Sequence, residues 1–123
     1  MTIIEAINRI DTLKPNTYSQ VEKVMWLSNL DGIIKSNVID THEGGEAVVF
    51  DGYNESTPLT TEMLVKAPHD DIYIKWLDSW IDYTNGEFAK YNNSAQAYND
   101  AYTAFERHYN RTHMPKATKI KYF

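Results

Sequence analysis

The chain has 123 residues, a formal net charge of −5, 42% hydrophobic and 13% aromatic residues, and no cysteine. These values indicate one globular domain with a packed core and exclude disulfides and thiolate metal sites. They also argue against a dedicated nucleic-acid binder, which would carry a basic stripe, and the short apolar runs predict neither a membrane span nor a secretory signal.

The first predicted element is a helix over residues 1–13. Thr2 and Glu5 have the spacing of a capping box, in which each side chain accepts a hydrogen bond from a free backbone N–H group of the other residue. Apolar residues then recur in steps of three and four, and Pro15 ends the pattern because the residue before a proline is pushed out of helical geometry.

A second helix is predicted over about residues 20–40. Ser19 and Glu22 repeat the capping-box spacing, and a long apolar stripe follows. Gly32 lies inside this stripe and costs about 1 kcal/mol relative to alanine. Because the stripe continues on both sides of the glycine, we expect the helix to run through it.

Residues 43–57 predict a short β arm. The pairs Gly44-Gly45 and Asp51-Gly52 are turn signals, and a β-like run lies between them. An arm of this kind has little to bury by itself, so a neighbouring subunit is its natural partner. We expect this arm to contact that subunit through its four apolar and aromatic residues, Val48, Val49, Phe50 and Tyr53.

Residues 70–112 predict two antiparallel helices that share an aromatic face. The first is expected to start at Asp70 or Asp71 and to continue across Asn85-Gly86, because aromatic residues keep helical phase up to Tyr91. The predicted turn lies at residues 92–94, where Ser94 would cap the second helix. The expected fold is therefore mainly α, a bundle of about four helices over residues 1–115.

Residues 116–123, KATKIKYF, form the expected extended C-terminal tail. This segment carries three lysines and no acidic residue. Such a segment suits β-augmentation, in which backbone hydrogen bonds give affinity and alternate side chains give specificity; the alternative is a merely mobile end. The predicted partner-contact residues, for a portal or a neighbouring subunit, are Lys116, Lys119, Ile120, Lys121, Tyr122 and Phe123.

The sequence shows no catalytic or metal-binding signature, so we expect a protein that is not an enzyme and has no cofactor. His108 and His113 are five residues apart and do not share a helix face, as two metal ligands on one helix would. Asp78 and Asp82 are i, i+4, a pattern that an exposed helix face also produces. No serine lies in a nucleophile-elbow motif, and no glycine-rich loop suits phosphate binding.

Three stretches carry a resemblance to a known family: WLSNLDGIIKSNVIDTH at 26–42, MLVKAPHDDIYIKWL at 63–77, and IDYTNGEFAKYNNSAQAYNDAYTAFERHYNRTHMP at 81–115. With these stretches the chain resembles small proteins of tailed phages and prophages of Gram-positive bacteria that are similar to head–tail connector (adaptor, head completion) proteins. The resemblance covers about residues 1–115 and is clearest over 68–115.

This resemblance implies a structural subunit of the phage neck. Such subunits form a ring, commonly of twelve copies, that joins the portal protein to the next neck or tail protein and continues the DNA channel. The implied location is the virion neck, with assembly in the bacterial cytoplasm, and DNA would only pass through. The alternative function is a small phage regulatory or host-interaction protein that acts as a monomer or dimer.

Overall fold

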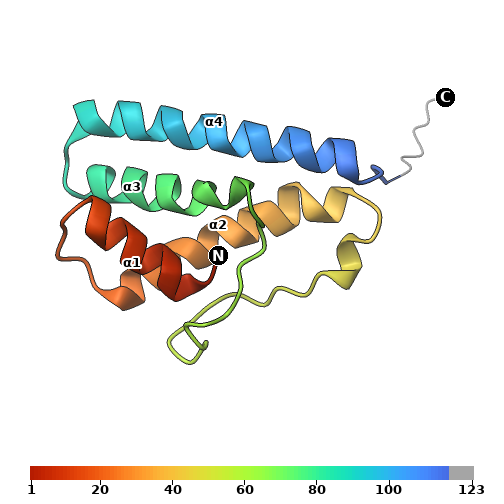
Figure 1. The fold of residues 1–123 in the computed structure, drawn as a ribbon, viewed down its shortest axis with the longest axis horizontal. Helices are drawn as coiled ribbons and strands as arrows, with labels where there is room; N and C mark the ends of the chain where they lie inside the picture. The colour runs from red at the N-terminus through yellow and green to blue at the C-terminus, as the bar shows by residue number, and fades with distance from the viewer. Residues whose placement is uncertain (117–123) are drawn as a thin grey trace.

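The computed structural model describes residues 1–116 and is mainly helical (Figure 1). The α-helices are α1 (Ile3–Leu13), α2 (Gln20–Asn37), α3 (Ile72–Thr84) and α4 (Phe88–Thr112). Three 3-10 helices of one turn, η1 (Ile39–Thr41), η2 (Gly45–Ala47) and η3 (His69–Asp71), lie between α2 and α3. No helix in this part of the chain is both long and apolar enough to cross a membrane.

The predicted start of α1 is confirmed at the level of individual hydrogen bonds. Glu5 N donates to Thr2 Oγ1 over 3.2 Å, and Thr2 N donates to Glu5 Oε1 over 2.8 Å. The apolar stripe of this helix is buried as the spacing indicates, through Ile3, Ala6, Ile7 and Ile10. The start of α1 is therefore encoded locally.

Helix α2 begins as predicted and ends slightly earlier than expected. Ser19 Oγ accepts a 3.1 Å hydrogen bond from Glu22 N and caps the first turn. The α-helix stops at Asn37, and the chain tightens into η1 instead of continuing to residue 40. Gly32 lies within α2 as predicted.

The boundary between α3 and α4 differs from the prediction. The chain turns at Asn85-Gly86, where Gly86 has φ of 74°, and not at residues 92–94. Ser94 lies inside α4, where its hydroxyl donates to Tyr91 O rather than capping a helix. The helical phase of the aromatic residues was misleading because Tyr83, before the turn, packs against Phe88 and Tyr91 after it.

Helix α3 forms the middle of the bundle. It contacts each of the other three α-helices, with α4 along one side and α1 and α2 on the other (Figure 1). Its buried apolar residues are Ile72, Tyr73, Leu77 and Ile81, whereas α4, though 25 residues long, contributes only Phe105 to the fully buried apolar core. Helix α4 is therefore an outer layer held mainly by half-buried aromatic side chains.

The expected β arm is not found. Among residues 1–116 the structure has no strand and only two isolated bridges, Thr2 with Glu62 and His42 with Pro115. Gly44 has φ of 84°, and a Cβ on Gly45 would lie 2.3 Å from Ile39 O, so the two glycines serve a tight turn against η1. The chain instead forms η2 and then continues irregularly along the bundle (Figure 1).

Candidate functional site

The two segments predicted to contact partners are joined to each other at one end of the bundle. Glu43 N donates to Met114 O over 2.8 Å, and Lys116 N donates to Thr41 O over 3.0 Å. These bonds hold Lys116 directly beside the start of the 43–57 segment.

His42 supports this junction from beneath. Its side chain is buried, with Nδ1 donating to Val38 O over 2.6 Å and Nε2 lying 2.8 Å from the Asn110 side-chain amide. The edge of its ring also meets Tyr109, with the centroids 4.8 Å apart. This histidine therefore links η1, α4 and the chain that leaves α4.

The four residues predicted for the arm have different surroundings. Val48 and Tyr53 pack against the core of their own chain, and Phe50 meets the ring of Tyr53 edge-on at 5.1 Å. Val49 is 78% exposed. Of the tail residues, Lys116 is exposed and lies 3.9 Å from Glu46. The remaining residues of that prediction, Lys119, Ile120, Lys121, Tyr122 and Phe123, lie outside the described residues.

A buried carboxylate that the sequence analysis did not single out attaches the irregular segment to the bundle. Asp31, on α2, is fully buried and accepts hydrogen bonds from Tyr73 Oη (2.6 Å), Tyr53 Oη (2.5 Å) and Leu64 N (3.1 Å). Burial raises the pKa of Asp31 above its ordinary value, although the two tyrosines oppose the shift. With three donors bound to it, this carboxylate holds the irregular segment on the bundle. Asp31 and its three donors are called the Asp31 clasp below.

Asp78 and Asp82, considered as paired carboxylates, share the ammonium group of Lys14. Lys14 Nζ lies 2.5 Å from an oxygen of each aspartate, and Asp82 is only 1% exposed, contrary to the expected solvent-exposed face. Burial opposes the charge on Lys14, but the two carboxylates hold its pKa above the ordinary value. An ion cluster between the end of α1 and α3 accounts for the i, i+4 spacing.

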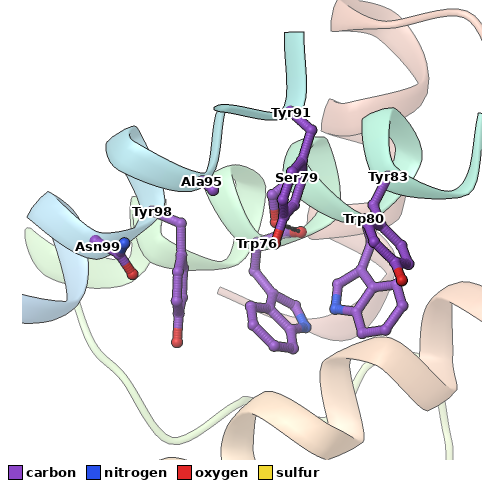
Figure 2. A pocket seen from close by; sticks show the side chains of 8 residues that line it. All are labelled: Trp76, Ser79, Trp80, Tyr83, Tyr91, Ala95, Tyr98 and Asn99. Carbon is purple, nitrogen blue, oxygen red and sulfur yellow. Dashed lines mark hydrogen bonds between the residues drawn. The ribbon is translucent and has the colours of Figure 1, made fainter. Parts of the chain in front are cut away.

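An aromatic groove lies between α3 and α4. It has a volume of about 410 Å³ and is lined by Trp76, Ser79, Trp80, Tyr83, Tyr91, Ala95, Tyr98 and Asn99, none of them charged (Figure 2). Figure 2 shows the rings of Tyr98, Trp76 and Trp80 next to one another on the same side of the two helices. The sequence predicts an aromatic face shared by the two helices, and the structure leaves part of that face open as this groove.

Contacts to α2 hold the groove walls in place. Trp80 stacks on Trp26 with centroids 5.6 Å apart, and Trp76 Nε1 donates to Trp26 O over 2.7 Å. The ring of Tyr98 lies against Trp76, with centroids 4.8 Å apart. Burial raises the pKa of Tyr98 above its ordinary value. The groove is therefore preformed, and it suits an apolar ligand rather than an anion or a metal ion.

The remaining histidines, His69, His108 and His113, lie near the C-terminal end of α4, away from the aromatic groove. A second pocket of about 390 Å³ is lined in part by His69, His108 and His113. The rings of His69 and His108 are 4.7 Å apart, whereas His113 stacks on Tyr109 at 3.8 Å. Within residues 1–116, no three His, Asp or Glu side chains come together in a way that could hold a metal ion.

Comparisons with known proteins give no family for this chain. No family model matches it, and neither curated proteins nor solved structures show a match.

Proposed function

We propose that this protein is a structural subunit of the neck of a tailed phage, where it forms a ring that joins the portal to the tail. The observation that supports this proposal is the junction at Thr41–Glu43 and Met114–Lys116, because it brings Lys116 and the start of the 43–57 segment together at one end of the helical bundle. A subunit built in this way can grip a neighbour or the portal from one end while the helices stack beside one another.

The surface chemistry supports assembly rather than catalysis. The groove is lined by tyrosine and tryptophan without a charged side chain, and these residue types dominate the energetics of protein interfaces. Two of the polar side chains buried among residues 1–116, Asp31 and Asp82, hold the chain's own segments together through hydrogen bonds and the ion pair with Lys14.

The charge balance agrees with a DNA conduit. A channel through which DNA slides should not hold phosphates tightly, and a basic lining would do so. The net charge of −5 avoids that attraction. A ring also requires a heterologous interface, in which one face of each subunit binds a different face of the next, and this agrees with contact surfaces at two places on the bundle.

The test is the particle mass of the full chain by light scattering, alone and with the cognate portal protein. We expect either a ring or a monomer that joins the portal in a fixed multiple. A monomer or dimer that is indifferent to the portal would contradict the proposal and favour the alternative, a phage regulatory or host-interaction protein.

A truncated chain that ends at Lys116 gives a second measurement. Because Lys116 N still reaches Thr41 O in this variant, the helices should stay folded, with an unchanged helical circular-dichroism spectrum. Attachment to the portal ring should be lost. Full attachment of the truncated chain would show that residues 117–123 do not serve assembly.

A further inference from the structure

The aromatic groove between α3 and α4 is an unfilled apolar surface. Tyr83 is 51% exposed and Phe88 62% exposed at the end where the two helices turn. Single exposed apolar residues are ordinary, but several aromatic rings around one groove are typical of an interaction site.

We propose that this groove binds residues 117–123 of a second copy of the chain. In an extended conformation, alternate side chains point to opposite sides, so Thr118, Ile120 and Tyr122 share one side while Lys119 and Lys121 share the other. The first side supplies two large apolar groups for the tryptophan and tyrosine walls. The second side keeps both ammonium groups outside the uncharged groove.

Charge favours the same occupant. Residues 116–123 contain three of the 12 lysine and arginine residues of the chain and none of its 17 acidic residues. The bundle that would receive the segment therefore holds every carboxylate side chain and is strongly acidic. The opposite overall charges of the segment and the bundle speed the encounter of two copies.

Chain length decides in favour of a second copy over the same chain. Tyr91, at one edge of the groove, lies 21 residues before the end of α4 at Thr112. At about 1.5 Å per helical residue this separation is about 32 Å. Seven extended residues beyond Lys116 span at most about 25 Å. Within its own chain the segment can therefore reach only the near edge of the groove at Asn99, about 20 Å from Thr112, and cannot run the length of the groove to Tyr91. Filling the whole groove requires the segment of a second copy.

This inference deepens the proposed ring, on which it rests. In this arrangement residues 117–123, which follow one end of α4, enter the α3–α4 groove of the next copy nearer the other end of α4. Such a contact is head-to-tail. A head-to-tail contact that closes on itself gives a ring. The inference names the two surfaces of that contact: residues 117–123 and the groove lined by Trp76, Trp80 and Tyr98.

Complementation between two defective variants tests it. One variant ends at Lys116 and keeps the groove; the other keeps the full chain but carries Ala95→Arg, which puts a long cation into the half-buried groove wall. We expect each variant alone to be monomeric at concentrations where the parent associates, and an equimolar mixture to form a 1:1 dimer in sedimentation velocity. The matched control is Ala104→Arg, the same change at an exposed position of α4, which should associate like the parent.

A peptide of residues 113–123 gives an independent readout. Added to the chain that ends at Lys116, it should change the tryptophan fluorescence saturably, because Trp76 and Trp80 line the groove. The same chain with Ala95→Arg should bind at least ten-fold more weakly, and a peptide with Ile120→Ser and Tyr122→Ser should not bind.

Three outcomes would overturn the inference: association that survives the truncation, a mixture of the two variants that stays monomeric, or a peptide that binds both groove forms equally. Failure of the neck proposal is a separate result. A chain that forms head-to-tail oligomers through the groove but ignores the portal would reject the neck function and keep the inference. If the parent chain binds the portal and the truncated chain still associates as the parent does, the neck function is kept and the groove inference is rejected.

Discussion

Tyr73 Oη donates a 2.6 Å hydrogen bond to Asp31 Oδ1 between residues 42 positions apart in the chain, and both groups are fully buried. The same tyrosine hydroxyl accepts a 2.8 Å hydrogen bond from Val65 N. With Leu64 N and Tyr53 Oη on the other carboxylate oxygen, this contact holds α2, α3 and the irregular segment before α3 together.

Removing the Asp31 carboxylate should therefore destabilise the fold. In Asp31→Ala three donors lose their acceptor: the fully buried Tyr73 hydroxyl and the half-buried Tyr53 hydroxyl and Leu64 N. An unsatisfied buried donor costs about 1–3 kcal/mol, partly offset here by the loss of a buried charge. We expect the free energy of unfolding to fall by about 3 kcal/mol in urea titrations followed by circular dichroism. Tyr53→Phe, which removes one donor, is the matched control with a smaller loss of about 1 kcal/mol. Parental stability of Asp31→Ala would contradict the clasp.

The pH dependence of stability should show the raised pKa of Asp31. Because burial raises this pKa in the folded state, the folded protein binds the proton more tightly than the unfolded chain. The contribution of Asp31 is therefore greatest below the unfolded pKa, about 3.9, and falls as pH rises through the folded pKa. The stability of the parent relative to Asp31→Asn, measured by urea unfolding between about pH 3.5 and 7, should decrease with rising pH. The opposite slope would show that hydrogen bonding outweighs burial.

Two glycine substitutions should have opposite signs. Gly86 turns the chain between α3 and α4 with φ of 74°, and a Cβ there would meet nothing within 4 Å, so Gly86→Ala should cost about 1–2 kcal/mol through backbone strain alone. Gly32 lies inside α2, where a Cβ would make an ordinary 3.8 Å contact with Phe50. Gly32→Ala should therefore raise the free energy of unfolding by about 0.5–1 kcal/mol. Thermal or urea unfolding of both variants checks the pair, and equal signs would contradict this assignment of the turn.

Lys14 should be needed because Asp82 is buried. In Lys14→Met the aliphatic stem remains but the Asp82 carboxylate, 1% exposed, loses the ammonium group 2.5 Å away. Breaking a buried ion pair from one side costs about 3–5 kcal/mol. Adding Asp82→Asn to this variant should restore part of the lost free energy of unfolding, because the uncompensated charge is removed. No recovery in the double variant would mean that Lys14 stabilises the fold through its stem alone.

The sequence predicted well where the decisive interactions are local. The capping box of Thr2 and Glu5 and the stripe from Ile3 to Ile10 lie within a few residues of one another, so spacing alone specifies α1. The start of α2 at Ser19 follows the same rule. A bundle of four α-helices could therefore be predicted from helix caps and apolar periodicity.

Ambiguous local signals led to the errors. The Asn85-Gly86 pair signals a turn, but the aromatic period continues across it, and the sequence does not say whether Tyr83 and Tyr91 follow one another along a helix or face one another across a turn. The packing of α4 back along α3 decides this, with their rings 5.3 Å apart. The expected β arm failed for a related reason: burial of Tyr53 against Asp31 draws the chain onto its own bundle.

By itself, the sequence determined the helical class, the first two helix starts, and the basic, alternating character of residues 116–123. Tertiary structure alone decided that Asp31 and Asp82 are buried, that residues 41–43 and 114–116 pair, and that aromatic residues of α3 and α4 leave a groove between them. The physical reason is the separation along the sequence between the residues that interact. Caps and periodicity act between residues a few positions apart, whereas the clasp, the junction and the groove join residues from separate helices whose approach depends on how the whole core packs.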